Sequence, residues 1–95
     1  MQTIILPGKS KEDKKWVDDL AQKLKDDGVE GIIRPFYWMH WEDEAFTFDV
    51  QEKAELIKKH LRGEKVNVIA KNEGLEIANI LKSLIPDQII AIELG

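Results

Sequence analysis

The chain has 95 residues, a length that suits one small domain spanning residues 1–95. It is 43% hydrophobic and 34% charged, which is typical of a globular protein and excludes a disordered one. The 14 basic residues are interspersed among 18 acidic ones, for a net charge of -4. The sequence therefore predicts no nucleic-acid partner, because phosphate binding needs clustered positive charge.

Signals for secretion, membrane insertion and redox chemistry are missing from the sequence. No apolar run approaches the roughly 20 residues of a membrane span, and the first six residues lack the basic region of a signal peptide. The absence of cysteine excludes disulfides, thiolate catalysis and thiolate metal ligands. We therefore expect a cytoplasmic domain with no membrane association and no cofactor.

The first third of the chain predicts two strands separated by a helix. Residues 3–6 form a short apolar run ended by a Pro-Gly pair, as in a buried parallel strand. Ser10 and Asp13 resemble a capping box in front of a helix that ends at Gly28. Residues 31–38 begin as a second strand, and Pro35 restricts it to the edge of a sheet because proline cannot donate to a central ladder.

The remaining chain predicts two helices and two strands. Asp49 is a suitable N-cap for a helix that ends at Gly63, and residues 66–70 form a third strand. The next helix covers residues 75–84, and residues 88–94 supply a fourth strand. The alternation βαβαβαβ predicts an α/β three-layer sandwich, in which helices cover both faces of a four-stranded parallel sheet.

The most informative motif lies between the third strand and its helix. Ala70 and Gly74 are small residues two positions on either side of Asn72. In a nucleophile elbow, a serine stands at that central position on a strained strand-to-helix turn. An asparagine amide is not a useful nucleophile near neutral pH. Asparagine also tolerates positive φ, so the turn has a structural interpretation that can hold together with the functional one.

Together with the first strand and its Pro-Gly loop, and with the aromatic residues 35–41, this motif resembles small bacterial α/β-hydrolases. The resemblance covers nearly the whole chain and implies the N-terminal half of the hydrolase core, with strand order 2-1-3-4. The family places its acid and histidine after later strands, which would lie beyond Gly95. With Asn72 in place of serine, the resemblance implies a non-catalytic domain of truncated or engineered origin.

The loop Gly8-Lys9-Ser10 is a candidate ligand site. A phosphate-binding loop needs a glycine five residues before the Gly-Lys pair, and Thr3 stands there, so we predict no nucleotide site. The resemblance implies an oxyanion loop, whose backbone N–H groups would face a pocket. A small-molecule or anion-binding module above the carboxyl ends of the strands is therefore an alternative function. Hydrolysis with Glu73 or His40 as general base is another.

Potential metal ligands lie close together at His40 and at residues 42–44, which are all acidic. A solvated acidic loop scatters its carboxylates, whereas a metal needs fixed ligand geometry, so we predict no metal site. His60 falls in the last turn of a predicted helix, where we expect a surface position.

Six of the seven aromatic residues lie within the thirteen residues 36–48. They could form the wall of a substrate pocket or pack a long loop, and packing is favoured because exposed aromatic clusters promote aggregation.

The fourth strand, Ile89 to Leu94, is an apolar edge whose only internal charge is Glu93. Such an edge is a template for pairing with another chain. We expect a homodimer in which this strand joins its counterpart across a two-fold axis.

Overall fold

A computed structural model describes residues 2–95. The elements in chain order are β1 (Gln2–Leu6), α1 (Asp13–Asp26), β2 (Ile32–Pro35), the 3-10 helix η1 (Met39–Trp41), α2 (Val50–Leu61), β3 (Val66–Ala70), α3 (Glu73–Leu84) and β4 (Ile89–Leu94). All neighbouring strands are parallel, and their order is β2-β1-β3-β4. The predicted α/β fold, its βαβαβαβ order and the strand order 2-1-3-4 are confirmed.

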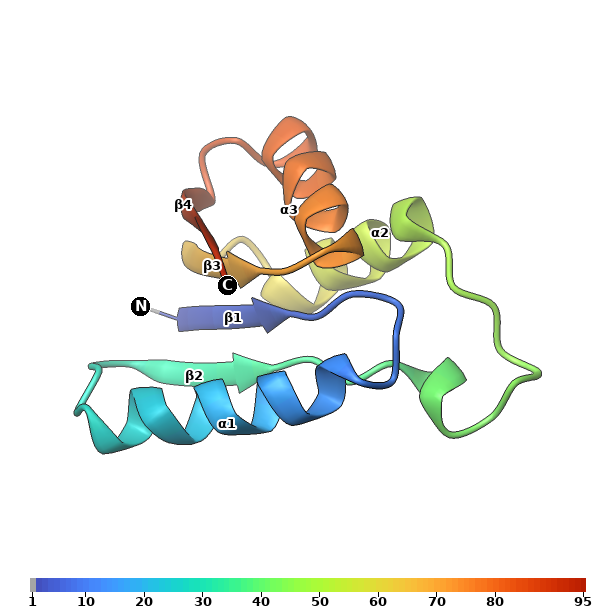
Figure 1. The fold of residues 1–95 in the computed structure, drawn as a ribbon. Helices are drawn as coiled ribbons and strands as arrows, with labels where there is room; N and C mark the ends of the chain where they lie inside the picture. Colours follow the sequence, from blue (N-terminus) through green and yellow to red (C-terminus); the bar gives the residue numbers. More distant parts are fainter. Residues whose placement is uncertain (1) are drawn as a thin grey trace.

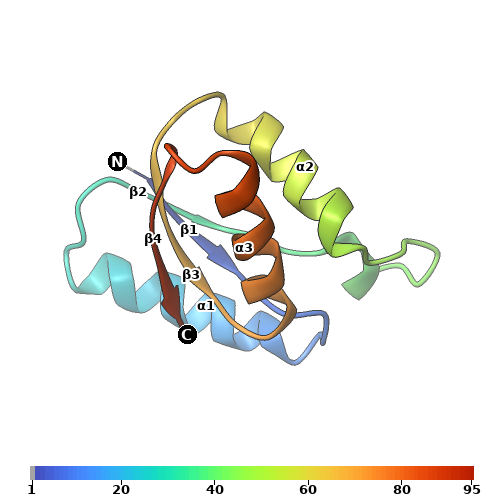
Figure 2. The same ribbon diagram turned by 90° about the horizontal axis from the view of Figure 1, so that it is seen from above.

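Helices cover both faces of the sheet, in three layers (Figure 1). Helix α1 packs against β1 and β2, whereas α2 and α3 lie side by side on the opposite face, as the view from above also shows (Figure 2). The larger part of the core lies beneath α2 and α3, and a smaller part around Ile5, Val17 and Ala21 lies beneath α1. Strand β1 is buried along its whole length, which explains the apolar run Ile4 to Leu6 at its end.

The predicted capping box at Ser10 and Asp13 is wrong. Helix α1 begins at Asp13, and the residue at its N-cap position, Glu12, makes no side-chain capping bond. Ser10 instead closes a turn: its Oγ accepts from the Glu12 N–H at 3.2 Å, and its carbonyl accepts from the Asp13 N–H at 3.0 Å. The carboxylate of Asp13 is therefore available to the loop that follows β1. The predicted cap at Asp49 is confirmed, because its side chain accepts from two backbone N–H groups of α2.

Strands β2 and β4 form the two edges of the sheet. Strand β2 ends at Pro35, as predicted for an edge strand. On β4, Ile89 is buried, whereas Ile90 and Leu94 are 48% and 76% exposed. The pairing of β4 with β3 contains a register shift between Val66 and Asn67. Within the described part of the chain, none of the helices has the length and apolar character needed to cross a bilayer.

Candidate functional site

The turn between β3 and α3 has a strained backbone. Asn72 has φ 54° and ψ -128°, so it adopts the positive φ that asparagine tolerates. A non-glycine residue in such a region costs on the order of 1–3 kcal/mol. Gly74 lies so close to the end of β1 that a Cβ atom there would overlap the carbonyl oxygen of Leu6. A Cβ atom on Gly8 would lie within 2.7 Å of three neighbouring side chains. The turn and the loop after β1 are thus in direct contact.

Asp13 joins this turn to the loop. Its side chain is buried, and its Oδ2 accepts hydrogen bonds from the Gly8 N–H at 2.8 Å and from Nδ2 of Asn72 at 3.3 Å. Its Oδ1 lies 4.0 Å from Nζ of Lys71, which also stands 5.5 Å from the centre of the Trp16 ring. The side chain at the centre of the elbow is therefore bonded to a carboxylate.

Glu73 makes the second carboxylate contact with the loop. Its Oε1 accepts from the Lys9 N–H at 2.8 Å. This bond, and then one from the backbone of Glu73 itself, lowers the pKa of the Glu73 carboxyl below its ordinary value. Glu73 is therefore charged and weakly basic near neutral pH. The N–H groups of Gly8 and Lys9, two of the donors expected of an oxyanion loop, are both bonded to carboxylates of the chain itself.

Two tryptophans hold the same loop from the other side. Nε1 of Trp38 lies 3.2 Å from the carbonyl oxygen of Pro7 and 3.1 Å from that of Gly8, and Nε1 of Trp41 donates to the carbonyl of Lys9 at 2.9 Å. Both residues are buried, with exposed fractions of 5% and 7%. Packing, the favoured interpretation of the aromatic segment, is confirmed for these two residues.

His40 is part of the same clamp. Its Nε2 lies 2.7 Å from the carbonyl oxygen of Lys9, and because a carbonyl only accepts, Nε2 carries the hydrogen. Its Nδ1 is buried and has no hydrogen-bond partner within residues 2–95. The ring lies 5.1 Å from that of Phe48 in an edge-to-face arrangement. The imidazole thus has a structural contact on one nitrogen, while the other is shielded from solvent.

An open hollow of about 630 Å³ lies over these groups. It is lined by Lys9, Ser10, His40, Asn72, Glu73 and Glu76. The structure therefore brings the predicted ligand loop and the elbow together, as the resemblance implied. One lysine faces two glutamates in this lining, so the hollow has no excess of positive charge.

The other residues considered as metal ligands do not line this hollow, with the exception of His40. Glu42, Asp43 and Glu44 are exposed after η1, and His60 is exposed near the end of α2. In the part of the chain that the structure describes, no three His, Asp or Glu side chains are grouped so that they could hold a metal ion. Of the potential metal ligands His40 and residues 42–44, only His40 lines the hollow.

The sequence analysis did not predict the bonds of Asp13, Trp38 and Trp41 to the loop after β1. A signal for the tryptophans existed, because a spacing of three places side chains on the same side of a 3-10 turn. Asp13 gave no such signal, since an acidic residue at the start of a helix is usually explained by the helix dipole.

Comparisons of the chain with protein-family models, curated protein sequences and solved structures found no match. The chain is thus a small α/β domain with a four-stranded parallel sheet, and no family is identified.

Proposed function

We propose that the chain is a non-catalytic α/β-hydrolase-like domain, in which the elbow serves the structure of the sheet and not a reaction. The backbone of Asn72, with Ala70 and Gly74 as its small flanks, supports the comparison with a nucleophile elbow. The observation that carries the proposal is the bond from the Asn72 amide to Asp13. The position of a nucleophile holds a side chain that donates a hydrogen bond and cannot attack a carbonyl.

The two candidate bases are poorly suited to activate a water molecule. Hydrogen bonds that stabilise the charged form lower the pKa of Glu73, and its Oε1 is already bonded to Lys9. His40 donates through Nε2 to a backbone carbonyl, and its Nδ1 is buried. Hydrolysis by a non-standard mechanism is therefore disfavoured at both residues.

An esterase assay with p-nitrophenyl acetate tests this proposal. We expect the wild type and Asn72→Ser to show no hydrolysis above that of Asn79→Ser, which places a serine on the exposed side of α3 as a matched control. The proposal fails if Asn72→Ser exceeds this control. It also fails if wild-type hydrolysis is present and is abolished by His40→Ala or Glu73→Gln.

Ligand binding in the hollow is a second candidate function, because the hollow has room for a small molecule and lies where open parallel sheets usually bind ligands. Its lining favours a neutral or cationic ligand over an anion, since Glu73 and Glu76 face only Lys9. Thermal shift measurements against small molecules of each charge separate the two functions. A ligand raises the melting temperature, and a non-binding domain shows no change.

We also propose that β4 pairs with β4 of a second copy of the chain. The outer edge of this strand has no strand partner in residues 2–95, and Ile90 and Leu94 are exposed beside it. A two-fold axis through Ile92 would set Ala91 opposite Glu93 of the second copy. This register keeps the two Glu93 carboxylates apart, whereas an axis through Glu93 would place like charges opposite each other.

A further inference from the structure

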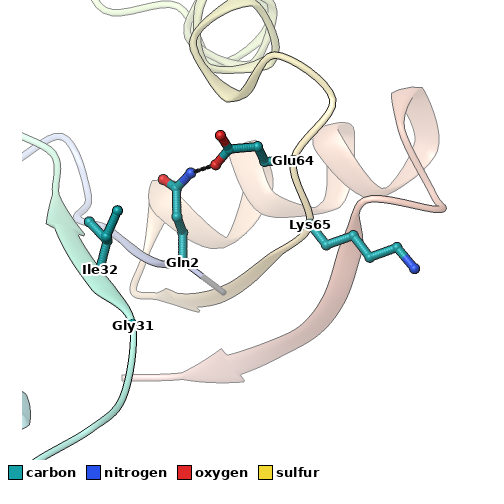
Figure 3. Close-up of a pocket in the computed structure, with 5 residues that line it drawn as sticks. All are labelled: Gln2, Gly31, Ile32, Glu64 and Lys65. Atoms are coloured by element: carbon teal, nitrogen blue, oxygen red, sulfur yellow. Dashed lines mark hydrogen bonds between the residues drawn. The ribbon is translucent and has the colours of Figure 1, made fainter.

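A second hollow lies at the other end of the sheet, where the strands begin. Gln2 extends from the start of β1 toward Glu64, and its Nε2 donates to the Glu64 carboxylate (Figure 3). Ile32 lies beside it on β2, while the side chain of Lys65 points away. Gln2 is only 5% exposed, yet its Oε1 is buried without a hydrogen-bond partner among the described residues. An unpaired buried acceptor of this kind calls for a donor.

A neighbouring hollow of about 490 Å³ shares Gln2 and Glu64 with the first. It is lined by Gln2, Arg34, Phe36, His60, Arg62 and Glu64. The salt bridges within residues 2–95 are all made by lysines, so neither arginine of this lining is paired with a carboxylate. Unpaired guanidinium groups are well suited to bind a carboxylate or another planar anion.

The same lining also carries acceptors. The carboxylate of Glu64 and the free Oε1 of Gln2 both accept hydrogen bonds, and the C-terminal end of α2, with its partial negative charge, leads into this region. A simple anion would be attracted by the arginines but repelled by the Glu64 carboxylate. A simple cation would do the reverse. The mixed lining therefore favours a ligand that carries both kinds of group.

We propose that this hollow binds a small zwitterion, an α-amino acid with an apolar side chain. Its carboxylate is bound by Arg34 and Arg62, with His60 as a further donor, and its ammonium group by Oε1 of Gln2 and by Glu64. The apolar side chain packs against Phe36, which is half-buried at the edge of the core. The site lies at the opposite end of the strands from the elbow, so it is independent of the function proposed above.

An NMR titration of the ¹⁵N-labelled chain with L-phenylalanine tests the proposal. We expect saturable amide shifts centred on Arg34, Arg62 and Glu64, with the probe added to about 10 mM, a concentration that detects millimolar affinity. Two truncated probes test the two halves of the site. 3-Phenylpropanoate lacks the ammonium group and phenethylamine lacks the carboxylate, and each should bind at least about 10-fold more weakly because one charged hydrogen-bonding group is lost.

Arg62→Gly separates binding from folding. Arg62 has φ 50°, a left-handed conformation that glycine adopts without strain, so this change should leave the fold intact. We expect it to weaken L-phenylalanine binding at least about 10-fold. Lys58→Gln is the matched control, since it removes one positive charge from the exposed surface of α2, the helix that Arg62 follows, and should leave binding unchanged.

Three results would overturn the proposal. The first is the absence of saturable amide shifts at about 10 mM L-phenylalanine, where a site of millimolar affinity would be mostly occupied. The second is equal affinity for L-phenylalanine and either truncated probe, which would indicate a simple anion or cation site. The third is wild-type affinity in a folded Arg62→Gly variant, which would show that the guanidinium has no part in the site.

Discussion

The Nδ2 group of Asn72 donates a hydrogen bond to Oδ2 of Asp13, 3.3 Å away, and so links the first turn of α1 to the turn that begins α3. The same oxygen accepts from the N–H of Gly8, at 2.8 Å. One buried carboxylate thus connects three segments at the carboxyl ends of the central strands. This connection explains why an asparagine is compatible with the elbow.

Replacement of Asn72 by alanine and by glycine measures the strain of the turn. Both changes remove the amide that bonds to Asp13, and they differ only in the Cβ atom. With φ 54° and ψ -128°, a Cβ atom is unfavourable, so Asn72→Gly should be more stable than Asn72→Ala by about 1–2 kcal/mol. Urea denaturation at pH 7 gives both free energies of unfolding. Equal stabilities would show that the backbone is not strained.

Gly74→Ala should destabilise the fold by about 3 kcal/mol or more, or prevent folding, because the added Cβ would overlap the carbonyl oxygen of Leu6. Gly63→Ala is the matched control. The positive φ of Gly63, 80°, disfavours any Cβ atom, but open space surrounds its Cβ position, so the cost there should be only about 1 kcal/mol. Thermal or chemical denaturation compares the two variants, and similar losses would contradict the close contact at Gly74.

The bond between Glu73 and the Lys9 N–H should make the stability of the fold depend on pH in the acidic range. Since the folded pKa of Glu73 lies below 4.5, the unfolded chain takes up the proton first as the pH falls. The stabilisation is present above pH 4.5 and is lost as the pH drops through the folded pKa. Glu73→Gln retains an acceptor but cannot titrate, so it should lose less stability than the wild type between about pH 5 and pH 3. Equal losses of unfolding free energy for the two proteins over this pH range would refute the prediction.

The hydroxyl of Tyr37 should lose its proton at an unusually high pH. This hydroxyl donates to Oδ1 of Asp18 at 2.6 Å, and this bond raises the pKa of Tyr37 to about 12. Because it is the one tyrosine in the sequence, phenolate absorbance near 295 nm reports this group alone. The bond stabilises the fold fully below pH 10 and is lost as the pH rises from 10 toward 12. Asp18→Asn should move the midpoint toward 10, and an unchanged midpoint would exclude the carboxylate as its cause.

The β4 edge predicts a dimer at about 100 µM, measured by light scattering after size-exclusion chromatography. Leu94→Lys should give a folded monomer, because this side chain is 76% exposed and a charge on the edge opposes pairing. Leu56→Lys, at a 42% exposed position on α2, is the control and should leave the dimer intact. A wild-type monomer at this concentration would eliminate pairing through β4.

The elements and their order could be predicted from the sequence because their signals are local. Asp49 caps α2 through bonds to N–H groups two and three residues away, and Pro35 ends an edge strand through its own missing N–H. The positive φ of Asn72 also follows from a pattern of five adjacent residues. Periodicity, caps and turns of this kind need no knowledge of what lies across the sheet.

The partners of the site residues depended on the tertiary structure. Asp13 looked like part of a capping box, yet its carboxylate bonds to Asn72, which is 59 residues away. Likewise, Trp38 contacts the carbonyls of a loop about 30 residues earlier. Only the strand order β2-β1-β3-β4 brings these segments to one end of the sheet. Hydrogen bonds form between groups within about 3.5 Å whatever their separation along the chain, so these contacts follow from the packed sheet and not from any local pattern.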